Sequence, residues 1–469
     1  MKHKKIICLL LASTVLLALI ACSKNGNGNG RPEVTEEFLE EHSYLEKDDL
    51  GGYEFRMLCR PGMIEDQYVE KQTGDIIADA VYERNLAVEA LLNVKITAVE
   101  SGDNKASDAL NSILAGDDQY DIILPHSRTA FQYAVQDALV NYNEISTLNL
   151  DAEWWSQDII DSANINNHLY VLDGDVQTHR LEYGFAMYFN KRIFDELGID
   201  YPYQMALDGE WTFDEFSKLV KLGSKDLNGD GILKPDDDQF GYYTWPTFGP
   251  IEVLYSGGQR IYSKNASGIP ILSVNSSKTV NIFSKFFDLC GSEDVYLKPA
   301  SVTVKEDLFT SGRAMFADKD LGSAKKMRTM ADDFGILPWP KFSEDDNYNT
   351  VVNGHASLVC MPVTVEDPEL TGQVLEALCA VGHNEVIPAF YEVSLKTKFS
   401  RDAESEAMID IIKDSLIYDL GYISGNTIQG TGEMLATMSN PDFASYYAAN
   451  ESKALNDLNE FLRAYAKIK

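Results

Sequence analysis

The sequence predicts an α/β protein whose sheets are mostly parallel and covered by helices. Residues 53–58 alternate polar and apolar side chains as a strand does, residues 75–92 follow a helical pattern, and residues 94–99 read as a second strand. A polar helix ending near Ala115 and an apolar strand at residues 120–124 complete a β-α-β-α-β order. This order is typical of parallel sheets, because each helix returns the chain to the starting edge.

Further strands and helices are predicted later in the chain. Residues 170–175 read as a strand followed by a turn, and residues 185–190 as a buried strand that leads into a short helix. Thr212 and Glu215 have the spacing of a capping box, which predicts the start of a helix there. Another strand is expected from Phe240. A chain of 469 residues is long enough for two globular units.

The N-terminal segment has the order of an export signal. Basic residues come first, an apolar run covers residues 6–20, and the small residue Ala21 precedes Cys22. The end of this segment resembles the bacterial lipobox, in which the cysteine thiol receives a diacylglycerol before cleavage. We therefore expect a signal peptide at residues 1–21 and lipidation of Cys22. The alternative is an apolar core segment with an incidental cysteine.

Residues 22–50 are expected to form a flexible acidic tether. They begin with a repeat of asparagine and glycine and continue with a run of glutamates, without a periodic apolar face. Such a segment has little apolar surface to bury, so it separates the folded body from the anchor. The predicted location is the extracytoplasmic face of a bacterial membrane.

The charge balance restricts the partners of the chain. It has 73 acidic and 40 basic residues and a net charge of −33. Nucleic acid is therefore not expected as a partner, and contact with the membrane is expected through acyl chains rather than a basic patch. The same charge favours a neutral or cationic ligand.

The loop at residues 226–238 has the oxygen-donor spacing of an EF-hand. The predicted calcium ligands are Asp226, Asn228, Asp230, the Ile232 carbonyl and Asp237. Gly231 permits the sharp turn at position six, but the usual Glu at position twelve is an Asp here. Pro235 leaves Asp236 and Asp238 as alternative last ligands. A solvated acidic turn is the competing interpretation.

Five short segments, taken in order, resemble the family 1 extracellular solute-binding proteins of bacterial ABC importers, the maltose-binding-protein type. They are Tyr-Asp-Ile-Ile at 120–123, Tyr-Phe-Asn-Lys at 188–191, Trp-Thr-Phe-Asp-Glu-Phe at 211–216 with the acidic loop after it, Phe-Thr-Ser-Gly-Arg-Ala-Met at 309–315, and Leu-Pro-Trp-Pro at 337–340. The resemblance implies a two-lobed periplasmic-binding-protein-like fold with a ligand cleft between the lobes. It also implies an ABC permease as partner.

The resemblance further implies where the chain passes between lobes. Crossings are expected near residues 172–178, 352–358 and 388–396. The expected lobe one then holds residues 50–172 plus 355–390, and lobe two holds residues 173–354 plus 391–469. We expect the protein to act as a monomer.

Many members of this family bind oligosaccharides, which directs attention to aromatic and hydrogen-bonding side chains. A sugar ring packs its C–H face on an aromatic plane, and its hydroxyls pair with polar side chains. Trp245 is the first expected contact and Trp339 the second. The other expected ligand-binding residues are Tyr348, Tyr255, His126, Arg128, Asp173 and Arg180. His126 and Arg128 follow a predicted strand, where open α/β sheets bind ligands. Core packing is the alternative for each aromatic residue.

Different functions remain open from the sequence. A lipid-anchored glycoside-active enzyme would need two carboxylates placed in space, which no sequence pattern excludes. The sequence has no G-x-S-x-G, H-E-x-x-H or P-loop motif, so we expect no enzymatic activity. The chain could also bind a non-sugar solute such as a peptide, or act as a surface adhesin.

Overall fold

The computed structural model describes residues 47–299, 307–391, 402–425 and 442–467. These residues belong to one compact unit, Leu45–Lys469. Cys22, the predicted signal peptide and most of the predicted tether lie outside the described residues. Within the described ranges, no helix combines the length and apolar character needed to cross a membrane.

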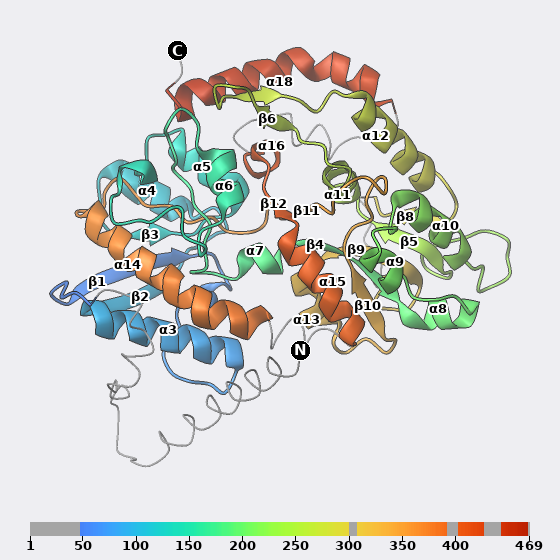
Figure 1. Cartoon of the computed structure of the whole chain (residues 1–469), viewed down its shortest axis with the longest axis horizontal. Helices are drawn as coiled ribbons and strands as arrows, with labels where there is room; N and C mark the ends of the chain where they lie inside the picture. The colour runs from blue at the N-terminus through green and yellow to red at the C-terminus, as the bar shows by residue number, and fades with distance from the viewer. Residues whose placement is uncertain (1–46, 300–306, 392–401, 426–441, 468–469) are drawn as a thin grey trace, which may run out of the picture. The chain divides into compact units, whose positions relative to one another are not determined.

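The first sheet is parallel and has the strand order β2-β1-β3. Its elements are β1 (Tyr53–Cys59), α3 (Ile76–Leu92), β2 (Val94–Glu100), α4 (Ser107–Ala115) and β3 (Ile122–Ile123). The predicted β-α-β-α-β order is confirmed. The side chain of Asp75 caps α3 by accepting hydrogen bonds from two backbone N–H groups, and α14 (Pro368–Val381) packs on α3 (Figure 1).

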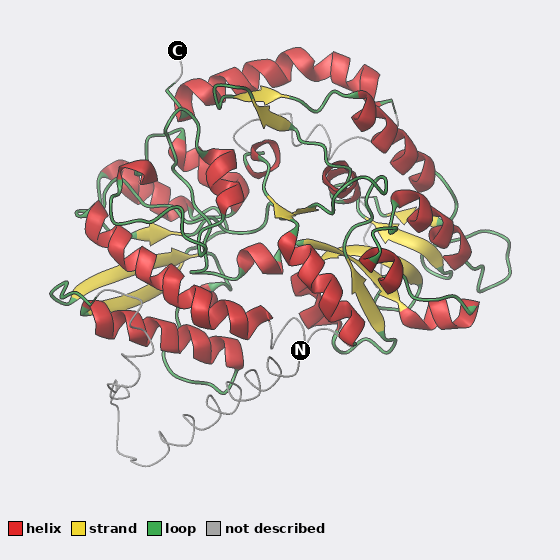
Figure 2. Cartoon of the chain, in the orientation of Figure 1, coloured by secondary structure: helices red, strands yellow, loops and turns green. Residues whose placement is uncertain are grey.

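The second sheet is mixed and has the order β10-β4-β9-β5-β8. Its strands are β4 (Phe185–Asn190), β5 (Phe240–Thr244), β8 (Val295–Leu297), β9 (Ala314–Asp320) and β10 (Phe334–Leu337), and Figure 2 shows helices around both sheets. Strand β4 is antiparallel to both of its neighbours, whereas β5 runs parallel to β8 and β9. The predicted strands at 185–190 and from Phe240 are present. Residues 170–175 form no regular strand, and Leu172 makes a single bridge to Val359.

Helix α10 (Phe213–Gly223) begins as the capping box predicts. The hydroxyl of Thr212 accepts a hydrogen bond from the backbone N–H of Glu215 at 3.4 Å. The helix packs directly on β5, where a Cβ on Gly241 would lie 1.8 Å from the carbonyl oxygen of Val220. Only glycine permits this close approach of helix and strand.

The remaining elements surround the sheets. They are α5 (Ser127–Ala134), α6 (Gln157–Ala163), α7 (His179–Glu182), α8 (Lys191–Leu197), α9 (Tyr203–Leu207), α11 (Gly249–Ser256), β6 (Tyr262–Lys264), β7 (Pro270–Leu272), α12 (Ser277–Cys290), α13 (Ala324–Met327), β11 (Thr350–Val351), α15 (Ala403–Asp414), β12 (Leu416–Ile417), α16 (Leu420–Ile423) and α18 (Phe443–Tyr465). Helix α18 contacts α12, and its last residue, Tyr465, lies with its ring centroid 5.8 Å from that of Phe131 in α5. The C-terminal helix therefore joins elements from both halves of the sequence.

Two adjacent indoles are held by one carboxylate. The Nε1 atoms of Trp154 and Trp155 donate to the two carboxylate oxygens of Glu376, at 3.0 and 2.9 Å respectively. Trp155 is buried, and its ring lies where a Cβ on Gly174 would have to be. Both rings therefore serve packing against α14, which the sequence pattern did not predict.

A buried carboxyl pair joins helix α11 to the second sheet, with Glu252 on α11 and Asp318 on β9. Each residue is 2% exposed, and neither carboxyl group has a hydrogen-bond partner of ordinary geometry among the described residues. Burial raises the pKa of Glu252 well above its usual range, and the neighbouring Asp318 raises it further. Burial also raises the pKa of Asp318, to about 6. The pair therefore holds protons in the folded state at a pH where the unfolded chain has lost them.

This pair makes stability depend on pH in a defined direction. Because the folded state binds more protons, the free energy of unfolding falls as pH rises from the usual carboxyl pKa of about 4 toward neutrality. Glu252→Gln removes one titrating group and supplies an N–H donor to Asp318. We expect thermal melts to show a midpoint a few degrees above wild type near pH 8, with a smaller difference near pH 5. The exposed Glu404→Gln is the control, and parallel pH profiles for all three proteins would contradict the expectation.

Candidate functional site

Polar side chains converge where two parallel strands end. Arg60 directly follows β1, and His126 comes shortly after β3. Because β1 and β3 pair in parallel, their carboxyl ends lie at the same edge of the sheet. The predicted placement of His126 at a strand end agrees with this geometry.

A segment from much later in the chain closes over this edge. The hydroxyl of Ser127 donates to the carbonyl of Gly354 at 2.7 Å, and the Ser127 backbone N–H donates to Ala356 at 2.8 Å. This brings His355 against His126, with the ring centroids 4.8 Å apart and the rings edge to face. His355 is exposed, so this group of side chains reaches solvent there.

Arg128 and Tyr422 complete the group. The guanidinium carbon of Arg128 lies 6.0 Å from the centroid of the Tyr422 ring. The hydroxyl of Tyr422 donates to Asn353 at 3.5 Å, and the same Asn353 oxygen lies 2.7 Å from Nδ1 of His355. We call Arg60, His126, Arg128 and His355 the cationic cluster, because all four side chains are charged or can accept a proton.

The cationic cluster contains buried hydrogen-bonding atoms that the described residues leave without partners. These atoms are Nε and Nη2 of Arg60, Nε of Arg128 and Nδ1 of His126. Arg60 is 3% exposed. Buried donors without acceptors are costly, so such a group is suited to a ligand that supplies the missing oxygen atoms.

The electrostatics of the cationic cluster keep its histidines neutral. Burial lowers the pKa of His126 to about 3, and the adjacent His355, Arg60 and Arg128 act in the same direction. Desolvation, followed by the charges of Arg60 and Arg128, also lowers the pKa of His355. The two rings therefore present neutral nitrogen atoms to solvent or ligand at neutral pH.

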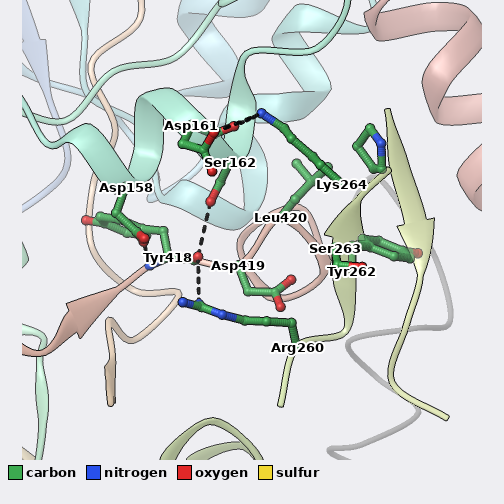
Figure 3. A pocket seen from close by; sticks show the side chains of 11 residues that line it. Asp158, Asp161, Ser162, Arg260, Tyr262, Ser263, Lys264, Tyr418, Asp419 and Leu420 are labelled. Carbon is green, nitrogen blue, oxygen red and sulfur yellow. Dashed lines mark hydrogen bonds and ion pairs between the residues drawn. The ribbon is translucent and has the colours of Figure 1, made fainter. Parts of the chain in front are cut away.

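A cavity of about 230 Å³ lies elsewhere, among α6, the β6–β7 hairpin and α16. Figure 3 shows Arg260, Lys264 and Asp419 around it. These groups already have partners, since Arg260 donates to the Tyr418 carbonyl at 3.1 Å, Lys264 pairs with Asp161, and Asp419 accepts from Ile261 and Gly421. The cavity is large enough for a small solute, but a solute would have to compete with these internal bonds.

Trp245 lies at the carboxyl end of β5 and is half-buried. The ammonium of Lys298 sits 3.6 Å from the centroid of its indole ring, so one ring face is covered. Phe248 packs beside it, with centroids 6.4 Å apart. Two of the predicted aromatic contacts, Trp245 and Trp339, follow a strand. Trp245 is the more accessible of the two.

The other predicted aromatic contacts are more enclosed. Trp339 is 3% exposed and faces Phe216, at 6.4 Å between centroids, and its buried Nε1 has no partner among the described residues. Tyr255 is fully buried and packs on Tyr422 at 6.4 Å. Tyr348 is half-buried and donates its hydroxyl proton to the carbonyl of Ala206 at 2.9 Å.

Asp173 and Arg180 lie near each other and are both engaged. Asp173 is buried and accepts hydrogen bonds from Tyr418 at 2.8 Å and Gln177 at 3.0 Å. Burial raises its pKa, while the charge of Arg180 opposes this effect. Arg180 also lies 3.5 Å from Asp175.

The acidic loop at residues 226–238 is held by hydrogen bonds between its carboxylates and its own backbone. The carboxylate of Asp226 accepts N–H bonds from Gly229 and Gly231, at 2.6 and 2.7 Å, while Asp230 pairs with Lys234. Asp238, rather than Asp237, turns back to accept from the backbone of Lys234. In the described part of the chain, no group of three or more His, Cys, Asp or Glu residues is placed to hold a metal ion. Calcium binding by this loop stays a prediction.

Four members of the site were missed from the sequence: Arg60, Asn353, His355 and Tyr422. Arg60 could have been found, because it follows a predicted strand as His126 does. His355 and Asn353 lie in a predicted crossing, but no local pattern indicated that they approach His126. Tyr422 lies in the short helix α16 and gave no sequence signal.

Residues 86–358 match the family described as bacterial extracellular solute-binding protein. No curated protein matches the chain. Among solved structures, a Listeria monocytogenes ABC substrate-binding protein in complex with cycloalternan is 14% identical, with a TM-score of 0.53, over 89% of this chain and 99% of that one. UgpB from Mycobacterium tuberculosis in complex with glycerophosphocholine is 13% identical, with a TM-score of 0.55, over 87% of this chain and 98% of that one.

The GacH receptor of Streptomyces glaucescens, solved unliganded and with acarbose, is 12% identical, with a TM-score of 0.53, over 89% of this chain and all of that one. At these identities the structural likeness shows the fold, which is the predicted periplasmic-binding-protein-like α/β fold. The family match covers more than half of the 469 residues. The chain therefore belongs to the bacterial extracellular solute-binding protein family.

Proposed function

We propose that this protein captures a sugar or sugar derivative outside the cell and delivers it to the permease of an ABC importer. The proposal depends on buried polar groups that converge at the ends of β1 and β3. Several of their side-chain atoms have no hydrogen-bond partner among the described residues. Family membership supports it. The related structures that hold cycloalternan, acarbose and glycerophosphocholine support a hydroxyl-rich solute.

The side chains around the cationic cluster suit such a solute. Arg60, His126 and Asn353 offer polar atoms for hydroxyl or oxyanion groups, and Tyr183 and Tyr422 supply rings beside them. Trp245, at the end of β5, would contact a further part of a longer ligand. Binding of this kind orients the solute without reacting with it.

The two carboxylates whose charges reach Arg60 are already bonded to basic side chains. Asp66 and Glu182 are the acids whose charges reach Arg60, and each is paired: Asp66 with His179 at 2.8 Å, Glu182 with Lys325 at 2.9 Å. Glycoside hydrolysis requires one carboxyl group as acid and another as base or nucleophile. Two carboxylates engaged in ion pairs are poorly suited to either role.

The anchor belongs to the same proposal. Cys22 would carry a diacylglycerol, and residues 22–50 would let the folded body move near the membrane while remaining attached. An ABC permease is the partner proposed for a monomer of this protein. Attachment would keep the captured solute close to that importer.

Solute capture predicts stabilisation by ligand without its consumption. We expect a panel of oligosaccharides and sugar derivatives to include a compound that raises the thermal midpoint of the purified protein. At ~100 times its dissociation constant, such a ligand adds about 2.7 kcal/mol to the free energy of unfolding. A reducing-end assay run in parallel should find the ligand intact, whereas new reducing ends would favour a glycoside-active enzyme.

The two tryptophans predict opposite outcomes on substitution. Trp245→Ala should weaken binding of the panel ligand and cost less stability than Trp339→Ala, because the ring is only half-buried against the core. Trp339→Ala should cost about 3–5 kcal/mol of stability, because it empties a core position. Denaturant unfolding and ligand titration measure the two effects. An unchanged ligand affinity in Trp245→Ala would remove Trp245 from the proposed site.

Calcium binding by the loop at 226–238 remains a prediction. If the loop binds calcium, a chelator should lower the thermal midpoint of the wild type, and added calcium should restore it. The double variant Asp226→Ala plus Asp230→Ala should melt at the same temperature with and without chelator. A wild-type midpoint that ignores the chelator would leave the loop as an acidic turn.

A further inference from the structure

The cationic cluster stands out against the charge of the whole chain. The protein has a net charge of −33, yet two arginines and two histidines meet at the ends of β1 and β3. The charges of Arg60 and Arg128 both act on His126 and on His355. Two guanidinium groups close to two neutral histidines in an acidic protein call for a physical explanation.

Ion pairing within the protein does not neutralise this excess. Asp66 and Glu182, whose charges reach Arg60, are bonded to His179 and Lys325. Tyr183 hydrogen-bonds Arg60 but is a phenol, and its own pKa is raised by burial. Two guanidinium nitrogens of Arg60 are left buried without an acceptor among the described residues.

The missing partner can be defined by its chemistry. A guanidinium presents parallel N–H donors that match two oxygens of a carboxylate or a phosphate, and such charge-assisted pairs are stronger than bonds to a neutral hydroxyl. Arg60 and Arg128 come from different elements, and both have a buried Nε without a partner among the described residues. His126 and His355 can each take up a proton beside an anion.

Building on the proposed solute capture, we infer that the solute carries an oxyanion, a carboxylate or a phosphate ester, which binds at the cationic cluster between Arg60 and Arg128. The ligand is therefore an acidic sugar or a phosphorylated polyol rather than a neutral oligosaccharide. This departs from the neutral or cationic ligand that the net charge favours. The sugar portion contacts the surrounding tyrosines, and the oxyanion supplies the acceptors that the buried arginines lack.

Matched pairs of compounds test this inference by calorimetric titration of the purified protein. The pairs are oligogalacturonate with its methyl ester, glucose 6-phosphate with glucose, and glycerol 3-phosphate with glycerol. At least one acidic member should bind about tenfold or more tighter than its neutral partner, and which pair responds distinguishes carboxylate from phosphate. Inorganic phosphate alone should raise the thermal midpoint more than chloride at equal ionic strength.

Variants connect the binding to the named residues. Arg60→Gln and Arg128→Gln should each reduce the preference for the acidic member to near unity, whereas the exposed Arg463→Gln should leave it unchanged. Without ligand, Arg60→Gln should melt at or above the wild-type temperature, because it removes a buried charge that lacks an acceptor. This second readout separates loss of binding from loss of folding.

Proton uptake gives an independent measurement. Arg60 and Arg128 face both histidines, and His355 also faces His126. An anion placed among them favours the protonated rings, so the acidic compound that binds best in the titrations should bind more tightly as pH falls from about 6 toward 4. His126→Gln should reduce this dependence.

The outcomes separate this inference from the proposed function. Equal affinity for both members of every pair, or an Arg60→Gln variant with an intact preference, overturns the oxyanion inference while solute capture stands. Failure of every acidic compound to bind, with a neutral sugar binding in its place, also overturns the oxyanion inference alone. Cleavage of the bound compound would overturn solute capture itself.

Discussion

The parallel pairing of β1 with β3 is the constraint on which the site depends. It places the chain after both strands at one edge of the first sheet, so Arg60 and His126 approach each other although 66 positions separate them. Ile123 in β3 also bridges to Cys360, and this bridge fixes the segment that precedes Cys360. The position of His355 follows, because the same segment is tied to the start of α5 through Ser127. One strand pairing therefore organises three distant parts of the chain.

Local sequence signals predicted the elements of the first sheet and several later ones, but residues 170–175 form no regular strand. The alternation at residues 53–124 predicted the first sheet, and Thr212 predicted the start of α10 through a hydrogen bond between neighbours in sequence. These features depend on contacts within a few residues, which a sequence shows directly. The mixed direction of the second sheet depends on how β4 pairs with β9 and β10, and no local pattern carries that information.

The candidate site could be predicted only where a strand end marks it. His126 and Arg128 were found by that rule, and Arg60 satisfies the same rule after β1. Aromatic identity was a weaker guide. Trp155 is buried against Glu376, and Trp339 lies in the core, so both of these rings pack inside the protein. Asn353 and Tyr422 enter the site through tertiary contacts alone.

Two kinds of buried ionisable group, the Glu252–Asp318 pair and Arg60, have side-chain atoms without hydrogen-bond partners among the described residues, and the consequences differ. Glu252 on α11 and Asp318 on β9 are neighbours, and each can become neutral by keeping a proton. Arg60 lacks that option, because a guanidinium stays protonated under all ordinary conditions even though burial lowers its pKa. In the oxyanion inference, an anion supplies the acceptors that Arg60 lacks. Because His355 beside it is exposed, that anion can arrive from solvent, and the unfavourable burial of Arg60 in the empty protein becomes binding energy once the site is filled.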